Sequence, residues 1–232
     1  MTMLLTTYQN FLNKLPNFDG IPALLIRLYL APIFIMAGFS KTQLLNDEVT
    51  GLASFMADPN IIAWFGNSDW GLGLPFPALL ANLVVLVEFF GGWLLLFGAL
   101  TRLISIPLMF TMVVAATTVH AENGWFAITP TNPDISAAKV LDWAGIDQAQ
   151  ASLENSTETA RKIEVMREIL EENGNTDWLY SNGNIVVLNN GIEFSATYFI
   201  MLLALFFIGA GRYTSIDYYL FKRLEERNIF KN

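Results

Sequence analysis

Residues 76–119 read FPALLANLVVLVEFFGGWLLLFGALTRLISIPLMFTMVVAATTV, two apolar runs separated only by Thr101 and Arg102. A helix needs roughly 20 apolar residues to cross a hydrocarbon core of about 30 Å. Residues 76–100 and 103–119 therefore predict two membrane-spanning helices joined in a tight antiparallel hairpin. Arg102 places a positive charge at its tip.

Two further apolar runs, residues 21–39 and 193–210, predict two more spans. The whole chain is 53% hydrophobic and 15% charged, which is more apolar surface than one soluble core needs. The expected fold is an all-α membrane protein, a four-transmembrane-helix bundle formed by residues 21–120 and 193–212. Residues 1–20 carry apolar side chains at helical spacing, so we expect an interfacial N-terminal helix there, retained on the mature protein.

Charge sets the expected orientation, because loops rich in Lys and Arg are held in the cytoplasm. In the four-span arrangement these cations fall on one side: Lys14, Arg102, Arg212, Lys222, Arg223, Arg227 and Lys231. Residues 42–75 contain no Lys or Arg but four acidic residues, and residues 121–192 carry eleven acidic against four basic side chains. We therefore expect both termini, including the tail 213–232, in the cytoplasm, and residues 121–192 as an acidic extracytoplasmic cap.

The cap is too long for an ordinary connection, so we expect it to fold. Asn155 and Glu158 resemble a helix start, and apolar residues then recur on one face as far as Asn173-Gly174, which predicts an amphipathic helix. Residues 178–187 surround Asn182-Gly183, a dipeptide that favours a tight turn, and predict a short β-hairpin.

Composition excludes several chemistries. The chain has no cysteine and one histidine, so it cannot build a disulfide, an iron–sulfur cluster or a bis-histidine haem site by itself. It also lacks a glycine-rich phosphate loop, a nucleophile elbow and a basic stripe for nucleic acid. We therefore expect no nucleic-acid partner.

Ionisable residues inside the spans are the strongest functional signal, because each is costly in lipid unless paired or hydrated. Arg27 in span one and Glu88 in span two lie at similar depths when the spans run antiparallel, so we expect them to pair directly or through water. Two interpretations remain open: a functional polar centre, or a buried ion pair that only fixes helix register.

A second polar group is expected at the outer ends of the spans, and it contains Lys41, His120, Glu193 and Tyr198. These side chains can extend the polar centre or simply anchor helix ends in the headgroups. His120 with the thioethers of Met109 and Met112 is the candidate metal site, suited to Cu(I), although apolar packing explains the methionines as well.

Several motifs in this order resemble the DoxX family: Arg27, Gly38-Phe39-Ser40-Lys41, Glu88 with Gly91-Gly92, Thr101-Arg102, His120, Glu193, and the close at residues 209–217, GAGRYTSID. The long outer insertion and the stretches 69–77 and 189–193 are similar to the HvfX branch, associated with maturation of copper-binding modified peptides. The resemblance implies a multi-pass protein of the bacterial inner membrane, linked to membrane oxidoreductases, with quinone or copper as the cofactors to consider. It assigns no catalytic residue.

Three functions fit these observations. The first is a quinone-linked redox or copper-peptide maturation accessory subunit, with a polar intramembrane centre and a cap that docks a partner. The second is a permeation protein for a small solute, a metal or a proton, which with four spans implies a narrow path or a homo-oligomer. The third is a membrane scaffold that recruits extracytoplasmic partners. Only the resemblance favours the first, and whether the chain is an enzyme stays open.

Overall fold

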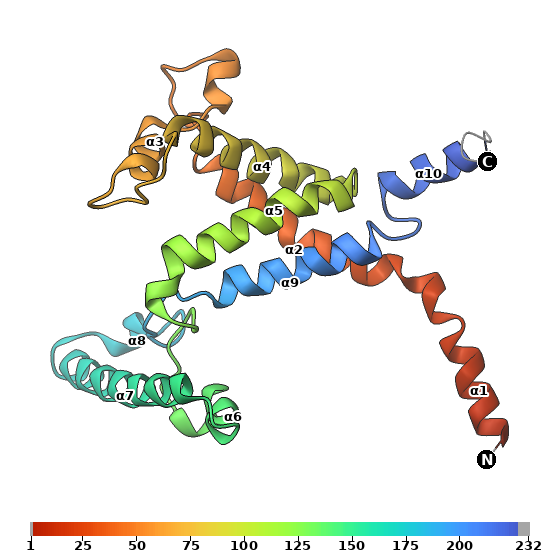
Figure 1. Cartoon of the computed structure of the whole chain (residues 1–232). Helices are drawn as coiled ribbons and strands as arrows, with labels where there is room; N and C mark the ends of the chain where they lie inside the picture. Colours follow the sequence, from red (N-terminus) through yellow and green to blue (C-terminus); the bar gives the residue numbers. More distant parts are fainter. Residues whose placement is uncertain (1, 227–232) are drawn as a thin grey trace. The chain divides into compact units, whose positions relative to one another are not determined.

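The computed structural model describes residues 2–226, and within this range the protein is helical, with no β-strand (Figure 1). Three helices are long and apolar enough to cross a membrane: α2 (Gly20–Phe39), α4 (Pro77–Phe97) and α5 (Thr101–Ala115), which continues through irregular helical turns to Asn123. The fourth apolar helix, α9 (Glu193–Ile208), has 16 residues and is about 24 Å long. Three of the expected spans are thus present by length and composition, and the fourth is shorter than predicted.

The remaining described helices are short or lie outside the apolar runs. They are α1 (Thr2–Leu12), α3 (Pro59–Gly66), α6 (Ala138–Trp143), α7 (Asp147–Asn173), α8 (Thr176–Leu179) and α10 (Ile216–Glu226), with 3-10 turns at Leu15–Phe18, Gly51–Phe55 and Pro133–Ile135. The helix expected near the N-terminus is confirmed as α1. Its place on a membrane surface stays a prediction.

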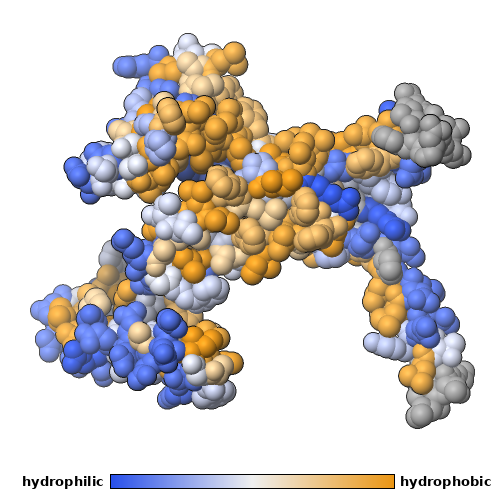
Figure 2. All heavy atoms as spheres, viewed as in Figure 1, coloured by the Kyte–Doolittle hydropathy of each residue, from blue (hydrophilic) through white to orange (hydrophobic). Residues whose placement is uncertain are grey.

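The chain divides into two compact units. The first contains residues 1–114 and 196–232, and therefore α2, α4, most of α5 and α9; the second contains residues 115–195. The side chains on the outside of the apolar helices are themselves apolar, such as Leu25, Leu83 and Phe110, and Figure 2 shows hydrophobic residues covering these helices on the visible face. Such a surface suits lipid rather than water.

Helices α2 and α4 pack closely because glycines lie at their crossing. A Cβ on Gly38 would collide with the backbone of Phe89, and one on Gly92 would lie 2.7 Å from the backbone nitrogen of Ile35. Helix α4 then ends at Gly98, whose φ of 64° suits glycine, and α5 begins at Thr101. The tight turn predicted between these two helices around Thr101 and Arg102 is confirmed.

The second unit corrects two predictions. The amphipathic helix exists and ends at Asn173 as expected, but it begins at Asp147 rather than near Asn155. Its buried face is built from small residues together with Ile163, so the helix packs closely on α6. Small residues give no apolar periodicity, which is why the first turns of the helix were not predicted.

The β-hairpin expected at residues 178–187 is wrong. Trp178 lies in the short helix α8, where the Asn175 side chain accepts a hydrogen bond from its backbone nitrogen and caps the helix. Gly183 does adopt a positive φ of 117°, but the segment after it forms no strand, and among the described residues its one bridge joins Leu188 to Ile128. A turn dipeptide without a partner strand does not make a hairpin.

Candidate functional site

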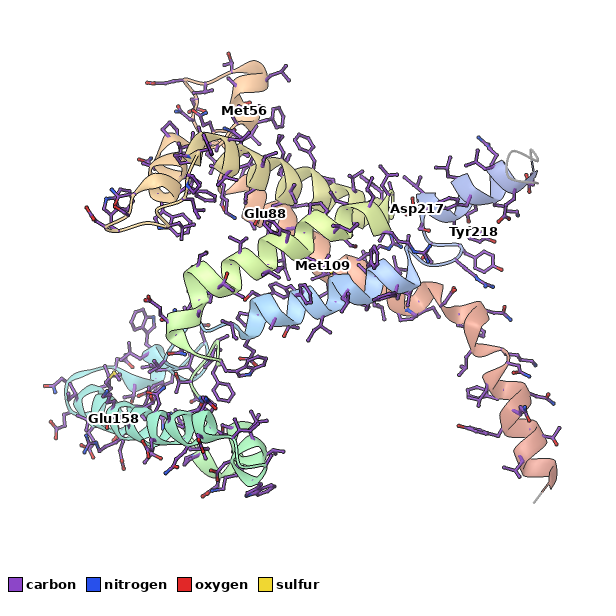
Figure 3. The ribbon with its side chains drawn as sticks, viewed as in Figure 1. Met56, Glu88, Met109, Glu158, Asp217 and Tyr218 are labelled. Carbon is purple, nitrogen blue, oxygen red and sulfur yellow. The ribbon has the colours of Figure 1, made fainter. Side chains whose placement is uncertain are left out.

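The most buried ion pair joins Lys41 and Glu88. The Lys41 Nζ lies 2.5 Å from Glu88 Oε2, and the two side chains are 24% and 7% exposed. Lys41 follows the end of α2, and its Nζ also donates to the carbonyl of Ala37, 3.0 Å away. Glu88 lies in the middle of α4 (Figure 3). The pair therefore fastens the end of one apolar helix to the interior of the next.

The crossing register explains why these two residues meet. Because Gly38 packs on Phe89, Glu88 is level with the last turn of α2, from which Lys41 reaches back. Side chains on a helix tilt toward its N-terminus, so Glu88 points along α4 in the direction of Lys41. The next two residues of α4, Phe89 and Phe90, have ring centroids 6.2 and 6.0 Å from that of Phe55.

Arg27 lies at the opposite end of the α2–α4 crossing. It is completely buried, and its guanidinium donates to the carbonyls of Leu95 and Leu96 at 3.3 and 3.2 Å and to the carbonyl of Thr214 at 2.8 Å. The direct Arg27–Glu88 pair expected from the sequence is therefore wrong. Helix α2 is displaced along α4, and antiparallel helices tilt the two side chains in opposite directions.

Asp217 completes the polar cluster around Arg27. It belongs to the motif at residues 209–217, but it was not predicted as a site residue. Its carboxylate accepts hydrogen bonds from the backbone nitrogens of Leu100 and Thr101, at 2.7 and 2.9 Å, and so caps the start of α5. Its own backbone nitrogen donates to the carbonyl of Gly98. Figure 3 shows Asp217 at the start of α10, beside the α4–α5 turn. A distant acidic cap of this kind leaves no local sequence signal.

His120 and Glu193 lie in the second unit, and each is hydrogen-bonded to loop backbone. The His120 Nδ1 lies 2.9 Å from the carbonyl of Asn190, and Glu193 Oε2 accepts from the backbone nitrogen of Ala127 at 2.9 Å. These bonds fasten the start of α9 to neighbouring loops. The contacts are those of structural residues, and a functional role for either stays a prediction.

The remaining candidates lie in the first unit. The ring of Tyr198 packs on Tyr29 with centroids 6.2 Å apart. Met112 is buried in the apolar core and Met109, labelled in Figure 3, packs against that core. Within residues 2–226 no group of three His, Cys, Asp or Glu side chains is placed to hold a metal ion. Copper binding by His120, Met109 and Met112 stays a prediction.

Comparison with known protein families matches residues 23–121 to the DoxX family model. The matched segment contains most of α2, all of α4 and α5, and the Lys41–Glu88 pair. No curated protein and no solved structure matches the chain.

Proposed function

We propose that this protein is a quinone-linked accessory subunit of a redox system in the bacterial inner membrane. Two observations support a membrane protein related to the DoxX family: residues 23–121 match that family model, and three helices are long and apolar enough to cross a membrane. The Lys41–Glu88 pair is the observation that carries this proposal. A buried ion pair between apolar helices costs desolvation free energy, and replacing such a pair with apolar residues is often neutral or stabilising. Packing alone therefore gives little reason to keep the two charges at this position.

The donor set at the pair fits a quinone head group. The Lys41 ammonium is a hydrogen-bond donor for a quinone carbonyl, and the Glu88 carboxylate is an acceptor for a quinol hydroxyl. The rings of Phe55, Phe89 and Phe90 contact one another and supply an apolar surface on the turn of α4 that follows Glu88. A bound quinone would supply two-electron chemistry, while Lys41 and Glu88 would orient its ring and hold the exchanged protons.

The charge of the acidic cap indicates what kind of partner the protein binds. Cap residues 121–192 carry eleven acidic against four basic side chains, so a basic extracytoplasmic partner would be attracted to them. We propose maturation of copper-binding peptides, as in the HvfX branch, as that setting. The cap then faces outward and both termini face the cytoplasm.

The first experiment measures quinone and activity together. Replacing Glu88 by Gln keeps the shape of the side chain but removes its charge, so E88Q should lower the quinone that copurifies with the protein and abolish complementation of a deletion strain. Membrane abundance should stay within about twofold of the wild type, because removing one charge leaves the apolar helix intact. The matched control is E193Q, a carboxylate outside the pair. Full complementation and unchanged quinone content in E88Q would overturn the proposal.

A charge exchange separates function from packing. The double variant K41E/E88K keeps opposite charges facing each other, so an ion pair that only fixes helix register should work in either orientation. We expect the double variant to recover abundance lost by K41E alone, but not activity or quinone binding. Recovery of both would show that the pair is structural.

A further inference from the structure

A charged cleft lies at one end of the apolar helices of the first unit. It has a volume of about 440 Å³ and is formed by the start of α5, the end of α9, the loop that follows α9, and α10. Three cations line it, and they come from three different elements: Arg102 from α5, Arg212 from the loop and Lys222 from α10. Three carboxylates, Asp19, Asp217 and Glu225, also line it.

Two of these carboxylates are already engaged. Asp19 Oδ2 lies 3.3 Å from the Arg212 Nε, so these two charges compensate each other. Asp217 accepts the backbone nitrogens of Leu100 and Thr101 through its two oxygens.

Two cations remain without a carboxylate partner in the described part of the chain. Arg102 donates to the carbonyl of Phe207 at 3.1 Å and forms no ion pair within residues 2–226, and the same range holds no ion pair for Lys222. Against them stands one uncommitted carboxylate, Glu225. The lining holds as many carboxylates as cations, but Asp19 is paired with Arg212 and the charge of Asp217 is opposed by Arg27. Arg102 and Lys222 are therefore the two cations open to a single phosphodiester.

The position of the cleft identifies the source of such a group. Arg102 begins an apolar span and the cleft continues past the last residue of α9, so the cations lie where apolar helices reach the headgroup layer. Ile208 and Phe221 line the cleft and are 45% and 57% exposed, and Leu103 beside Arg102 is 63% exposed. Apolar side chains next to two cations suit a molecule with a charged head and an acyl tail.

We propose that this cleft binds the head group of an anionic phospholipid. The Arg102 guanidinium and the Lys222 ammonium donate to the phosphate, and the acyl chains lie along the apolar outer surface near Leu103 and Ile208. Arg212 is held aside by Asp19 and is not required.

The test uses native mass spectrometry of the full-length protein released from nanodiscs of phosphatidylglycerol or of phosphatidylcholine. Wild type should retain phosphatidylglycerol preferentially. Each of R102Q and K222Q should weaken retention about fivefold, and the double variant about 25-fold, since one basic residue near a membrane surface contributes about that factor. The matched control is R223Q, because Arg223 is the neighbour of Lys222 on α10 but does not line the cleft. Its retention should equal that of wild type.

A gain-of-binding variant guards against misfolding. Removing the competing carboxylate in E225Q should raise phosphatidylglycerol retention about fivefold, a result that a damaged protein would not give. Equal retention of the two lipids, or equal loss in R223Q and K222Q, would overturn the proposal. Inorganic phosphate provides the last arm: binding of phosphate to lipid-free protein through Arg102 and Lys222, without lipid preference, would also overturn it and assign the cleft to a soluble phosphate.

Discussion

At the scale of single residues, the two buried charges of α2 and α4 bind partners at opposite ends of the α2–α4 crossing. Arg27 binds carbonyls at the end of α4 and in the loop before α10, while Glu88 binds Lys41. The sequence predicted that both charges need partners, because lipid does not supply them. The predicted pairing of Arg27 with Glu88 was wrong, because depth counted along each span ignores the displacement of one helix along the other.

The guanidinium of Arg27 gives a residue-scale prediction. In R27M the carbonyls of Leu95, Leu96 and Thr214 lose their donor in a buried site, so the free energy of unfolding should fall by about 3 kcal/mol. Thermal unfolding of the purified protein in detergent measures the change. The exposed Arg223 supplies the matched control, and R223M should unfold at the wild-type temperature. Equal unfolding temperatures for R27M and wild type would show that these hydrogen bonds add no net stability.

At the scale of elements, apolar length was the reliable signal and local motifs were not. Residues 76–119 predicted two helices and the turn between them, and both are present, because a long apolar run has few other ways to satisfy its backbone in lipid. The hairpin at Asn182-Gly183 failed since strand pairing depends on a partner segment that a dipeptide does not specify. The start of α7 was misplaced for a related reason: Asn155 has the chemistry of a cap, but the helix continues through it.

The glycines at the helix crossings give an element-scale prediction. A methyl group at Gly38 meets the backbone of Phe89, and one at Gly92 meets the backbone of Ile35, whereas one at Gly91 meets the Ile104 side chain at 3.0 Å. A side chain can move aside and a backbone cannot, so G38A and G92A should each destabilise the protein by about 1–3 kcal/mol, and G91A by less. Unfolding temperatures of the three variants measure the order, with G91A as the control from the same helix as Gly92. If G91A is the most damaging, the crossing described above is wrong.

At the scale of the whole molecule, the candidate site came only partly from the sequence. Lys41 and Glu88 were both chosen as candidates, and the structure brings them together, because helix packing places residues distant in the chain beside one another. His120 and Glu193 were chosen on the same grounds but contact loop backbone in the second unit. Ionisable residue type therefore marks where polar contacts occur, while tertiary contacts decide which of them are made.

The number of spans is the last question at this scale, since α9 has 16 residues and is shorter than the other three apolar helices. Such a helix can still cross where the bilayer thins or where flanking residues extend into the headgroups. We expect it to cross, which places α10 on the same side as the α4–α5 turn.

Single cysteines decide the matter, because the natural chain has none and labelling has no background. With four spans, a membrane-impermeant maleimide should label S68C and T157C in intact spheroplasts, and should label E226C only after lysis. The control is L100C, at the α4–α5 turn, which lies inside whether or not α9 crosses. If α9 does not cross, residue 226 lies on the outer side of the membrane. E226C then reacts in intact spheroplasts, while L100C stays protected. That pattern would place α10 outside, and the charged cleft, which needs Arg102 and Lys222 on one side, would be lost with the four-span fold.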